Sequence, residues 1–300
     1  MFALIKRVYE QKYKQLVAIT IAMLIIFSGV LLFHKLQTGE FIAKDISLKG
    51  GLLVTVHSDK KIDIVAVEKA LSRELGSSVS VKRLQAIGGV GALGYSFTLE
   101  RTEDTDAVLT AISKVTGIEL TKGTYTIEEV SSGFSTAFWQ STLKAIVIAF
   151  VLMIIVVLIY FRQLIPSFTV ILAAVCDLIG TLAIMSLLGI KLSIAGIAAL
   201  LMLIGYSIDT DILLATRMLK RTEGEIFERV KSSVKTGMTM QLTAIAALTV
   251  LWIVSPAEVL KQISAILIIG LLIDIPNTWV QNVGTLRWYL ELKEKKQQNV

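Results

Sequence analysis

Six long apolar runs divide this chain of 300 residues. They occupy residues 16–33, 143–161, 166–188, 194–214, 238–254 and 259–283. Each run is about 17 to 25 residues long, which is enough for an α-helix to cross the roughly 30 Å hydrocarbon core of a membrane. The pattern therefore predicts a polytopic α-helical membrane protein with six transmembrane helices.

The segment between the first two runs has the alternation of a small α+β domain. Apolar residues alternate in LLVTV, SVSV and YSFTL, and TYTIEEV gives a fourth candidate strand. Ile64, Val67, Leu71 and Leu75 recur at helical spacing, and EDTDAVLTAISKVTG begins with acidic residues and ends at a glycine, as helices do. The order β-α-β-β-α-β predicts a ferredoxin-like domain.

These patterns give the expected domain organisation. We expect a cytoplasmic N-terminus at 1–15, a first transmembrane helix at 16–36, an extracytoplasmic α+β domain with a polar linker (128–140) at 37–140, a five-helix bundle at 141–285, and a cytoplasmic tail at 286–300 whose charged end, LKEKKQQNV, is disordered. Basic residues precede the first run as in a signal peptide. Because the run is long and no small-residue cleavage pattern follows it, we expect a retained signal-anchor.

The charge distribution predicts the orientation. The net charge is +6, and most basic residues between the runs fall on one side of the membrane: Lys6, Arg7, Lys12, Lys14, Arg162, Arg217, Lys220, Arg221, Arg229, Lys231, Lys235, Arg287, Lys293, Lys295 and Lys296. The two short turns on the other side hold Lys191 and Lys261. The positive-inside rule then predicts a multi-pass cell-membrane protein with both termini cytoplasmic. This distribution explains the positive charge without a nucleic-acid partner.

The remaining motifs point away from enzymes and cofactors. Gly89, Gly91 and Gly94 match G-x-G-x-x-G, but a strand follows them where a dinucleotide site needs a helix, so we interpret them as a hairpin loop. The chain has no Walker A sequence, and its one cysteine, Cys176, cannot form an intrachain disulfide. We predict no cofactor, no metal site and no enzymatic activity.

Four carboxylates lie inside the predicted spans: Asp177, Asp209, Asp211 and Asp274. A charged Asp near the middle of a membrane costs about 2.5–3.5 kcal/mol, so these side chains are expected to face other helices, one another or water. We identify them as candidates for ion coupling. On a regular helix Asp209 and Asp211 point about 200° apart, so we expect one to serve structure and the other function.

Several polar residues are candidates for supporting these acids. The sequence Gly-Tyr-Ser ending at Ser207 could loosen the helix locally, and a neighbouring run starts with Lys235, Thr236, Thr239, Gln241 and Thr243. For the threonines, an alternative is that their hydroxyls only join helices together. Pro276 is expected to kink the sixth helix, with Asn277 as a partner for Asp274.

The motifs in the membrane runs resemble a known family. GYSIDTDILLATR is similar to the fourth-helix signature of the SecF protein-export membrane proteins, and AAVCDLIG resembles the family's Asp-containing third helix. DISLKGG is similar to the family's Gly-Gly motif after the first helix, and LLIDIPNTWVQN resembles the archaeal branch. The resemblance covers nearly the whole chain.

The resemblance implies a half-transporter of the resistance-nodulation-division type. Its implied partners are SecD, the Sec translocon channel, exported unfolded polypeptide and membrane lipid, with intramembrane acids coupling ion flow to movement of the outer domain. Asp177 and Arg217 match family positions. The family's Asn-Asp pair aligns with Asp209 and Thr210, and its Arg in the fifth helix aligns with Thr236, next to Lys235.

These departures leave proton coupling, sodium coupling and no coupling open. Three alternatives remain: a non-coupling structural subunit of the same complex, an unrelated transporter of the superfamily, and an intramembrane aspartyl protease. The protease is disfavoured because the acids sit in Val-Cys-Asp and Tyr-Ser-Ile-Asp rather than in that class's Tyr-Asp and Gly-x-Gly-Asp motifs.

Overall fold

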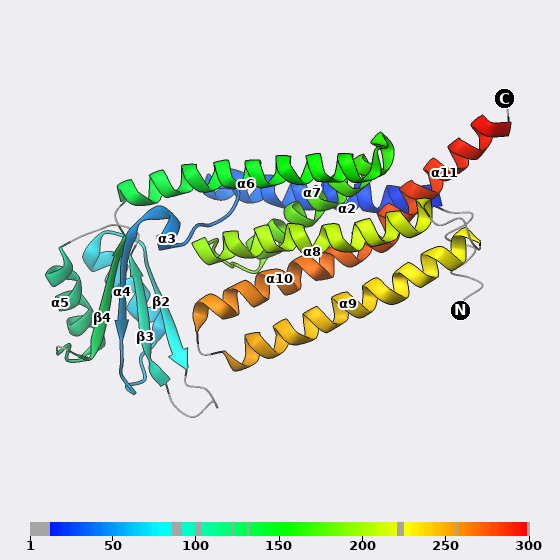
Figure 1. The fold of residues 1–300 in the computed structure, drawn as a ribbon. Coiled ribbons are helices and arrows are strands. Elements are labelled where there is room, and N and C mark those ends of the chain that lie inside the picture. The colour runs from blue at the N-terminus through cyan, green and yellow to red at the C-terminus, as the bar shows by residue number, and fades with distance from the viewer. Residues whose placement is uncertain are drawn as a thin grey trace.

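The structure is a computed structural model that describes residues 13–85, 92–99, 104–121, 123–130, 132–220, 225–255 and 257–298. It has two parts, a bundle of long helices and a small α/β domain at one end of that bundle (Figure 1). The start of the first described helix and the end of the last one lie at the opposite end (Figure 1).

The long helices of the bundle are α2 (Tyr13–Thr38), α6 (Ser132–Phe161), α7 (Leu164–Leu187), α8 (Ile194–Leu219), α9 (Ile226–Val254) and α10 (Glu258–Pro276). After α10 come a π-helix, η1 (Asn277–Asn282), and α11 (Val283–Gln298). Six helical segments of the described chain are long and apolar enough to cross a membrane, the last running from Glu258 to Lys293. The predicted six membrane helices are confirmed.

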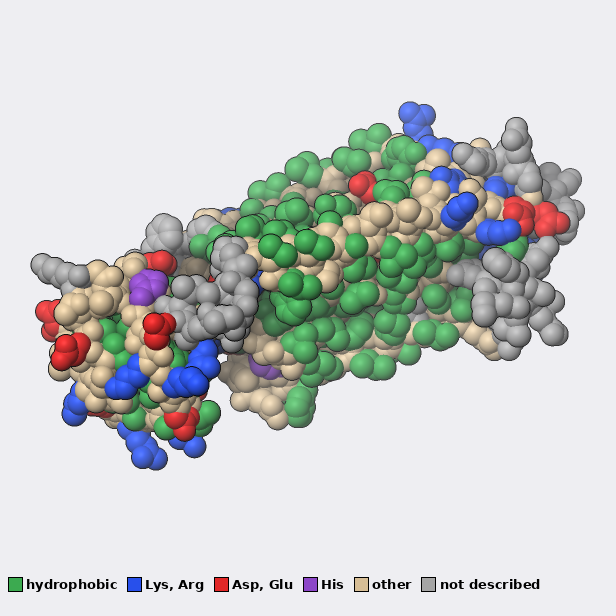
Figure 2. Space-filling model, turned by 90° about the horizontal axis from the view of Figure 1, so that it is seen from below, with side chains coloured by type: hydrophobic (Ala, Val, Ile, Leu, Met, Phe, Trp, Pro, Cys, Tyr) green, Lys and Arg blue, Asp and Glu red, His purple; other side chains and the backbone are tan. Residues whose placement is uncertain are grey.

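Three helices, α7, α8 and α10, form the centre of the bundle. α10 packs against α7, α8 and α9, and half of each apolar span in α7 and α8 is buried. In contrast, α2, α6 and α9 bury less than a fifth of theirs. These outer helices give the bundle its largely hydrophobic surface, while Lys and Arg gather at the end away from the α/β domain (Figure 2). This distribution fits helices that face lipid or another membrane subunit.

Two sequence predictions about the ends of helices are wrong. The expected linker at 128–140 is the end of strand β4 (Tyr125–Val130) followed by the first turns of α6. The charged end of the tail, expected to be disordered from Leu292, is helical to Gln298 in α11. Both segments contain many polar residues, but helical backbone hydrogen bonds continue beyond an apolar run, and LKEKKQQ consists mostly of strong helix formers.

Two predictions about helix interruptions also need correction. α8 is continuous through Gly205, Tyr206 and Ser207, because one glycine costs a helix only about 1 kcal/mol and packing outweighs this. At Pro276 the chain does not simply kink. Pro276 lacks a backbone N–H, and the six residues after it form a π-helix. The wider turn of this π-helix changes the direction in which its side chains project.

The α/β domain contains β1 (Gly51–Val56), α4 (Ile64–Leu75), β2 (Val79–Gln85), β3 (Ala92–Leu99), α5 (Thr105–Thr116) and β4, after a short helix α3 (Ile46–Lys49). Its sheet is antiparallel with strand order β2-β3-β1-β4. The predicted β-α-β-β-α-β order is therefore confirmed. One face of the sheet, with Leu52, Phe97 and Leu99 fully buried, packs on Leu71 of α4 and Ile112 of α5.

Local caps define both helices of this domain, and those of α5 are the acidic start and terminal glycine predicted from the sequence. The Asp63 carboxylate accepts hydrogen bonds from two backbone amides at the start of α4, and Asp104 caps α5 in the same way. Gly76 and Gly117 end the two helices in the left-handed conformation that glycine adopts without strain. Local capping therefore fixes where both helices begin and end.

The glycine motif has a structural role at Gly94. Gly89 and Gly91 lie outside the described residues, whereas Gly94 belongs to strand β3 and not to the predicted loop. Gly94 has φ of 143°, and a Cβ atom there would lie 1.9 Å from the carbonyl oxygen of Val56. The glycine therefore permits close approach of β3 to the end of β1.

The entry to the α/β domain is hydrogen-bonded to the bundle. The backbone N–H of Asp45 donates to the carbonyl of Leu192 over 2.8 Å, and the N–H of Leu192 donates to the carbonyl of Ala43 over 2.7 Å. Leu192 lies in the turn between α7 and α8. Gln262 of α10 also contacts this turn, because its amide donates to the carbonyl of Lys191 over 2.7 Å. The turn is thus held from two sides.

We predict that Gly94→Ala destabilises the α/β domain by about 3 kcal/mol or more, because the new methyl group adds steric overlap to an unfavourable φ. Gly123→Ala is the matched control: its φ is also positive, at 106°, but nothing lies within 4 Å of its new Cβ, so only about 1–2 kcal/mol is lost. Thermal unfolding of the full chain measures both. Equal losses would contradict the role assigned to Gly94.

Candidate functional site

Three of the four intramembrane carboxylates converge in the centre of the bundle. Asp177 of α7, Asp211 of α8 and Asp274 of α10 are each 1% exposed or less. Both Asp177 and Asp211 lie within electrostatic range of Asp274. The three central helices of the bundle therefore each contribute one carboxyl group to a single polar cluster, which we call the carboxyl cluster.

Asp177 is hydrogen-bonded from two helical segments. The hydroxyl of Ser207 in α8 donates to Asp177 Oδ2 over 2.5 Å, and the side-chain amide of Asn277 in η1 donates to Asp177 Oδ1 over 2.6 Å. The Asp177 carboxyl group thus bridges α8 and η1. Asn277 is expected from the sequence to partner Asp274, but it pairs with Asp177, because the π-helix turns its side chain toward α7.

Asp274 accepts hydrogen bonds from three side chains. Thr210 of α8 donates to Oδ2 over 3.2 Å, Gln241 of α9 donates to the same oxygen, and Thr278 donates to Oδ1 over 2.9 Å. The indole N–H of Trp279, which can only donate, bonds the carbonyl oxygen of Gln241 over 2.8 Å. This contact fixes the amide of Gln241 with its nitrogen toward Asp274.

Asp211 completes the carboxyl cluster at the side nearest α11. Its Oδ1 atom accepts from Thr278 over 2.9 Å and from the amide of Asn282. The Thr278 hydroxyl therefore contacts both Asp211 and Asp274 at 2.9 Å, yet it carries only one proton. It can donate to one carboxylate at a time. The other contact becomes a hydrogen bond only when that carboxyl group itself carries a proton.

Two buried polar atoms of the contacting pair Asp211 and Asn282, and two of Gln281, the residue before Asn282, have no hydrogen-bond partner among the described residues. They are Asp211 Oδ2, Asn282 Oδ1, and both polar side-chain atoms of Gln281. Buried polar atoms are nearly always paired with protein or water, so an unpaired group of this size is unusual. It makes this side of the cluster the one best suited to admit water or a small ion.

Asp209 does not join the carboxyl cluster. It is exposed on the outward face of α8, on the same side as Met202 and Tyr206, whereas Asp211 is buried. The two acids therefore point in different directions, as the regular helix predicts. An exposed carboxylate halfway along a membrane helix requires a polar partner from outside this chain or contact with water.

The predicted supporting residues divide into two groups. Ser207 belongs to the cluster, but Arg217 donates to the hydroxyls of Ser232 and Thr236, each over 3.0 Å, and so joins α8 to α9 near their ends away from the α/β domain. Lys235 and Thr239 are exposed, and the Thr239 hydroxyl donates to its own helix at Lys235. Thr243 does the same. The threonines of this face do not contact the acids.

Sequence reasoning missed most polar partners in the cluster. Thr210, Thr278, Gln281 and Asn282 were not identified as candidates, and together with Gln241 they supply much of the polar surface around the carboxyl groups. A usable signal was present, because residues 277, 278, 281 and 282 follow Asp274 at helical spacings of three, four, seven and eight. These positions fall on one face of the sixth span.

The arrangement suits proton or small-ion exchange better than catalysis or stable metal binding. The carboxyl groups accept hydrogen bonds from Ser, Thr, Asn and Gln side chains and not from Lys or Arg. Within the described ranges, no group of three or more His, Cys, Asp or Glu side chains is placed to hold a metal ion, since hydroxyl and amide groups separate the three acids.

Comparison with known proteins gives relatives along nearly the whole chain. The sequence model of the family described as "Protein export membrane protein SecD/SecF, C-terminal" matches residues 110–292. Protein-export membrane protein SecF of Pyrococcus furiosus is 36% identical over 98% of this chain and 96% of its own length. The SecF proteins of Methanocaldococcus jannaschii and Methanothermobacter thermautotrophicus are 39% and 40% identical, also over at least 95% of both chains.

The fold has a solved counterpart. The crystal structure of SecDF from Thermus thermophilus, described as a translocon-associated membrane protein, matches with a TM-score of 0.73 at 18% identity. The match covers 92% of this chain but 38% of that longer chain. At this identity the likeness concerns the fold alone. The family model and the sequence relatives show the family: this chain belongs to the SecD/SecF family of protein-export membrane proteins.

Proposed function

We propose that this chain is the SecF-like subunit of a SecD–SecF complex that assists Sec-dependent export of unfolded polypeptides, and that its carboxyl cluster exchanges protons during this work. Family membership supports the export role. The observation that carries the coupling proposal is the cluster itself, with three buried carboxyl groups on three helices bridged by hydroxyl and amide groups.

The charge of the carboxyl cluster gives the physical reason for proton exchange. Three ionised carboxylates close together in a membrane interior repel one another strongly, and no side-chain cation of the described residues is hydrogen-bonded to them. The single proton of Thr278 leads to the same conclusion, because its two contacts are both satisfied only when Asp211 or Asp274 is protonated. A bound proton therefore stabilises the cluster, and its release changes the contacts between helices.

The unpaired atoms around Asp211 suggest where the proton enters. Asp211 Oδ2, Asn282 Oδ1 and Gln281 lie next to α11, which leads to the end of the bundle away from the α/β domain. Water that pairs with these atoms would connect the cluster to that end of the bundle. We propose that this is the cytoplasmic side, because Lys and Arg gather there (Figure 2). Both termini are then cytoplasmic in the cell membrane.

A mechanical connection leads from the cluster to the α/β domain. Asp177 and Asp211 lie on α7 and α8, and the turn between these helices is hydrogen-bonded to residues 43–45 at the entry to the domain. A shift of α7 against α8 would therefore move the segment from which the domain starts. We propose that this path transmits the change in charge to the outer domain.

Asp209 indicates the face that binds the partner subunit. Lipid exposure of a charged Asp near the membrane centre costs about 2.5–3.5 kcal/mol, which contact with a second membrane subunit would avoid. The solved SecDF chain is much longer than this one, and the match covers 38% of it. We propose that SecD covers the exposed face of α8 at Asp209, and that the Sec translocon channel associates with this complex.

The alternative is a structural subunit of the same complex, in which Asp209 binds SecD and the carboxyl cluster only holds the bundle together. The exposure of Asp209 does not distinguish the two possibilities, because both require a partner subunit at this face of α8. The two differ in what the cluster does: proton exchange requires ionisable groups, whereas a purely structural cluster requires only hydrogen-bonding groups of the same shape.

We predict that Asp211→Asn and Asp274→Asn each reduce export of a secreted reporter at least tenfold in cells that depend on this protein, because the amide cannot exchange the proton. Pulse-labelling measures the export rate, and immunoblotting of membranes checks that the variant reaches normal levels. Thr243→Val is the matched control, because this exposed intramembrane hydroxyl contacts only its own helix. If both single variants and the double variant export the reporter at the wild-type rate, proton exchange by the carboxyl cluster is contradicted and the structural alternative is supported.

A second prediction concerns the partner face. Asp209→Leu is expected to lower the recovery of SecD about tenfold when the protein is purified from native membranes in mild detergent, because it removes an exposed carboxylate from this face of α8. Thr239→Leu, at an exposed position on α9, should leave recovery unchanged. If Asp209 instead faced lipid, the leucine would stabilise the isolated protein, and SecD recovery would not fall.

A further inference from the structure

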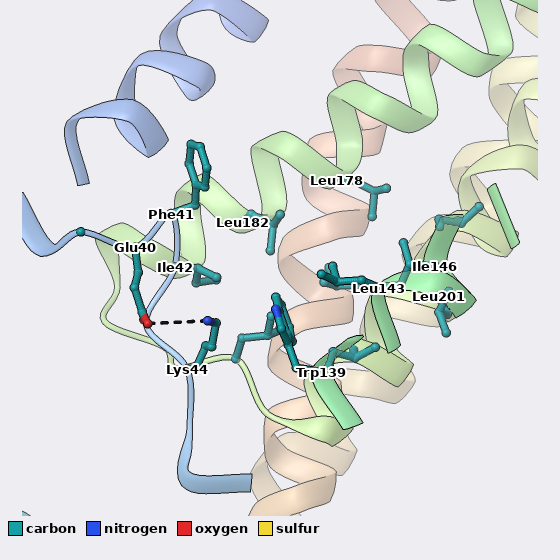
Figure 3. Close-up of a pocket in the computed structure, with 15 residues that line it drawn as sticks. Glu40, Phe41, Ile42, Lys44, Trp139, Leu143, Ile146, Leu178, Leu182 and Leu201 are labelled. Carbon is teal, nitrogen blue, oxygen red and sulfur yellow. Dashed lines mark ion pairs between the residues drawn. The ribbon is translucent and has the colours of Figure 1, made fainter. Parts of the chain in front are cut away.

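An apolar cavity of about 450 Å³ lies between α6, α7 and α8 at the end of the bundle that carries the α/β domain (Figure 3). Side chains of Leu143, Ile146, Leu182, Leu200 and Leu201 line it. α6 and α8 make few direct contacts with each other, so the cavity separates them. The segment at residues 39–44 forms its outer rim.

The cavity has the depth of part of one membrane leaflet. Along α8 its lining runs from Ile197 to Ile204, a rise of about 10 Å at 1.5 Å per residue. One leaflet of the hydrocarbon core is about 15 Å thick. The cavity therefore begins near the membrane surface and ends close to the level of Asp177, whose neighbour Leu178 lines its inner part.

Lysines and aromatic rings surround the outer rim. The Lys44 ammonium lies 4.8 Å from the centre of the Trp139 ring, and both residues line the cavity (Figure 3). Glu40 forms ion pairs with Lys44 at 3.6 Å and Lys49 at 3.5 Å. The Glu40 carboxylate is thus shared by two ammonium groups. Asp45, next to Lys44 in the chain, adds a second carboxylate, and the Lys35 ammonium, 4.3 Å from the centre of the Phe41 ring, adds a third cation, which leaves these five side chains with a net charge of +1. Lysine and tryptophan together are typical of a membrane–water interface.

We propose that this cavity binds one acyl chain of an anionic phospholipid, with the headgroup phosphate at Lys44 and Lys49. Glu40 and Lys44 at the rim are the charged residues of the lining, and the side chains deeper in the cavity are apolar, which suits a hydrocarbon chain better than a polar soluble ligand. The exposed apolar residues of α6, such as Val147 and Val151, provide a continuous path from the bilayer. The positive rim selects the anionic headgroup. This inference rests on the membrane-spanning fold and not on the export role.

The bound lipid would strengthen the junction between the bundle and the α/β domain. Lys44 belongs to the segment that bridges Leu192 in the turn between α7 and α8, so a headgroup held there contacts the connection between the two parts of the protein. The acyl chain fills the space between α6 and α8, where protein contacts are few.

Tryptophan quenching tests the proposal. The full-length protein, carrying Trp252→Phe and Trp288→Phe to remove two exposed indoles, is purified in an uncharged detergent. It is titrated with phosphatidylglycerol or phosphatidylcholine brominated in the acyl chain. Trp139 at the rim should be quenched at substoichiometric to stoichiometric lipid, while the buried Trp279 serves as the internal reference. We expect saturable quenching with a midpoint about 25-fold lower for phosphatidylglycerol, at about fivefold for each of the two lysines.

Three variants separate the charge from the cavity. The double variant Lys44→Gln with Lys49→Gln should abolish the preference for the anionic lipid, because each lysine contributes a preference of about fivefold. Leu182→Gln with Leu201→Gln, which places amide groups along the path of the acyl chain, should raise the quenching midpoint at least tenfold while leaving the fold intact by circular dichroism. Lys261→Gln, in the first turn of α10 at the same end of the bundle, should change neither the lipid preference nor the midpoint. Equal quenching by the two lipids, or an unchanged midpoint in the double glutamine variant, would overturn the proposal.

The partner subunit provides a last check. If a helix of a second protein occupied the cavity in the assembled complex, Trp139 in the purified complex would no longer be quenched by brominated phosphatidylglycerol. That result would overturn the lipid assignment. Retained saturable quenching in the complex is the expected result.

Discussion

Burial of carboxyl groups in an apolar bundle is the constraint on which the rest of this structure depends. An Asp side chain in the membrane interior has to find hydrogen-bond donors, and these can come only from neighbouring helices or from water. Asp177, Asp211 and Asp274 obtain theirs across helix interfaces, so α7, α8, α9 and η1 are joined around α10. The same contacts decide which helices lie at the centre and which face the membrane.

The π-helix after Pro276 shows how this constraint shapes the backbone. The regular helix changes to a π-helix at Asn277, and this segment carries Asn277, which bonds Asp177, and Thr278 and Asn282, which bond Asp211. The proline starts this change because it lacks an amide proton. Beyond the cluster, the turn between α7 and α8 links the bundle to residues 43–45. One continuous set of contacts therefore connects the buried acids with the entry to the α/β domain.

Much of this architecture could be predicted from the sequence, because it depends on periodicity and on local caps. Apolar runs indicate the six membrane helices, and alternation, the helical spacing from Ile64 to Leu75, and the acidic start and Gly117 end of α5 indicate the elements of the small domain. The divergence of Asp209 and Asp211 follows from helical geometry. The sequence resemblance to the SecF proteins is likewise confirmed by relatives covering nearly the whole chain.

The partners of the acids could not be predicted in the same way, because they depend on which helices pack together and on the pitch of η1. Asn277 was expected beside Asp274 from its nearness in sequence, but the π-helix places it on Asp177. Lys235 and Thr239 were chosen because they begin a neighbouring run, yet the rotation of α9 turns them outward and turns Gln241 inward. Tertiary packing decides such contacts, and pattern alone does not.

Infrared spectroscopy of the purified protein in lipid tests the central claim most directly, because a protonated carboxyl group absorbs separately from a carboxylate. The account predicts a protonated-carboxyl band at neutral pH in the wild-type protein. This band should shift in hydrogen–deuterium exchange and disappear when Asp211 and Asp274 are both replaced by Asn. A wild-type spectrum without that band, or a band unchanged by these replacements, would contradict a proton held in the carboxyl cluster.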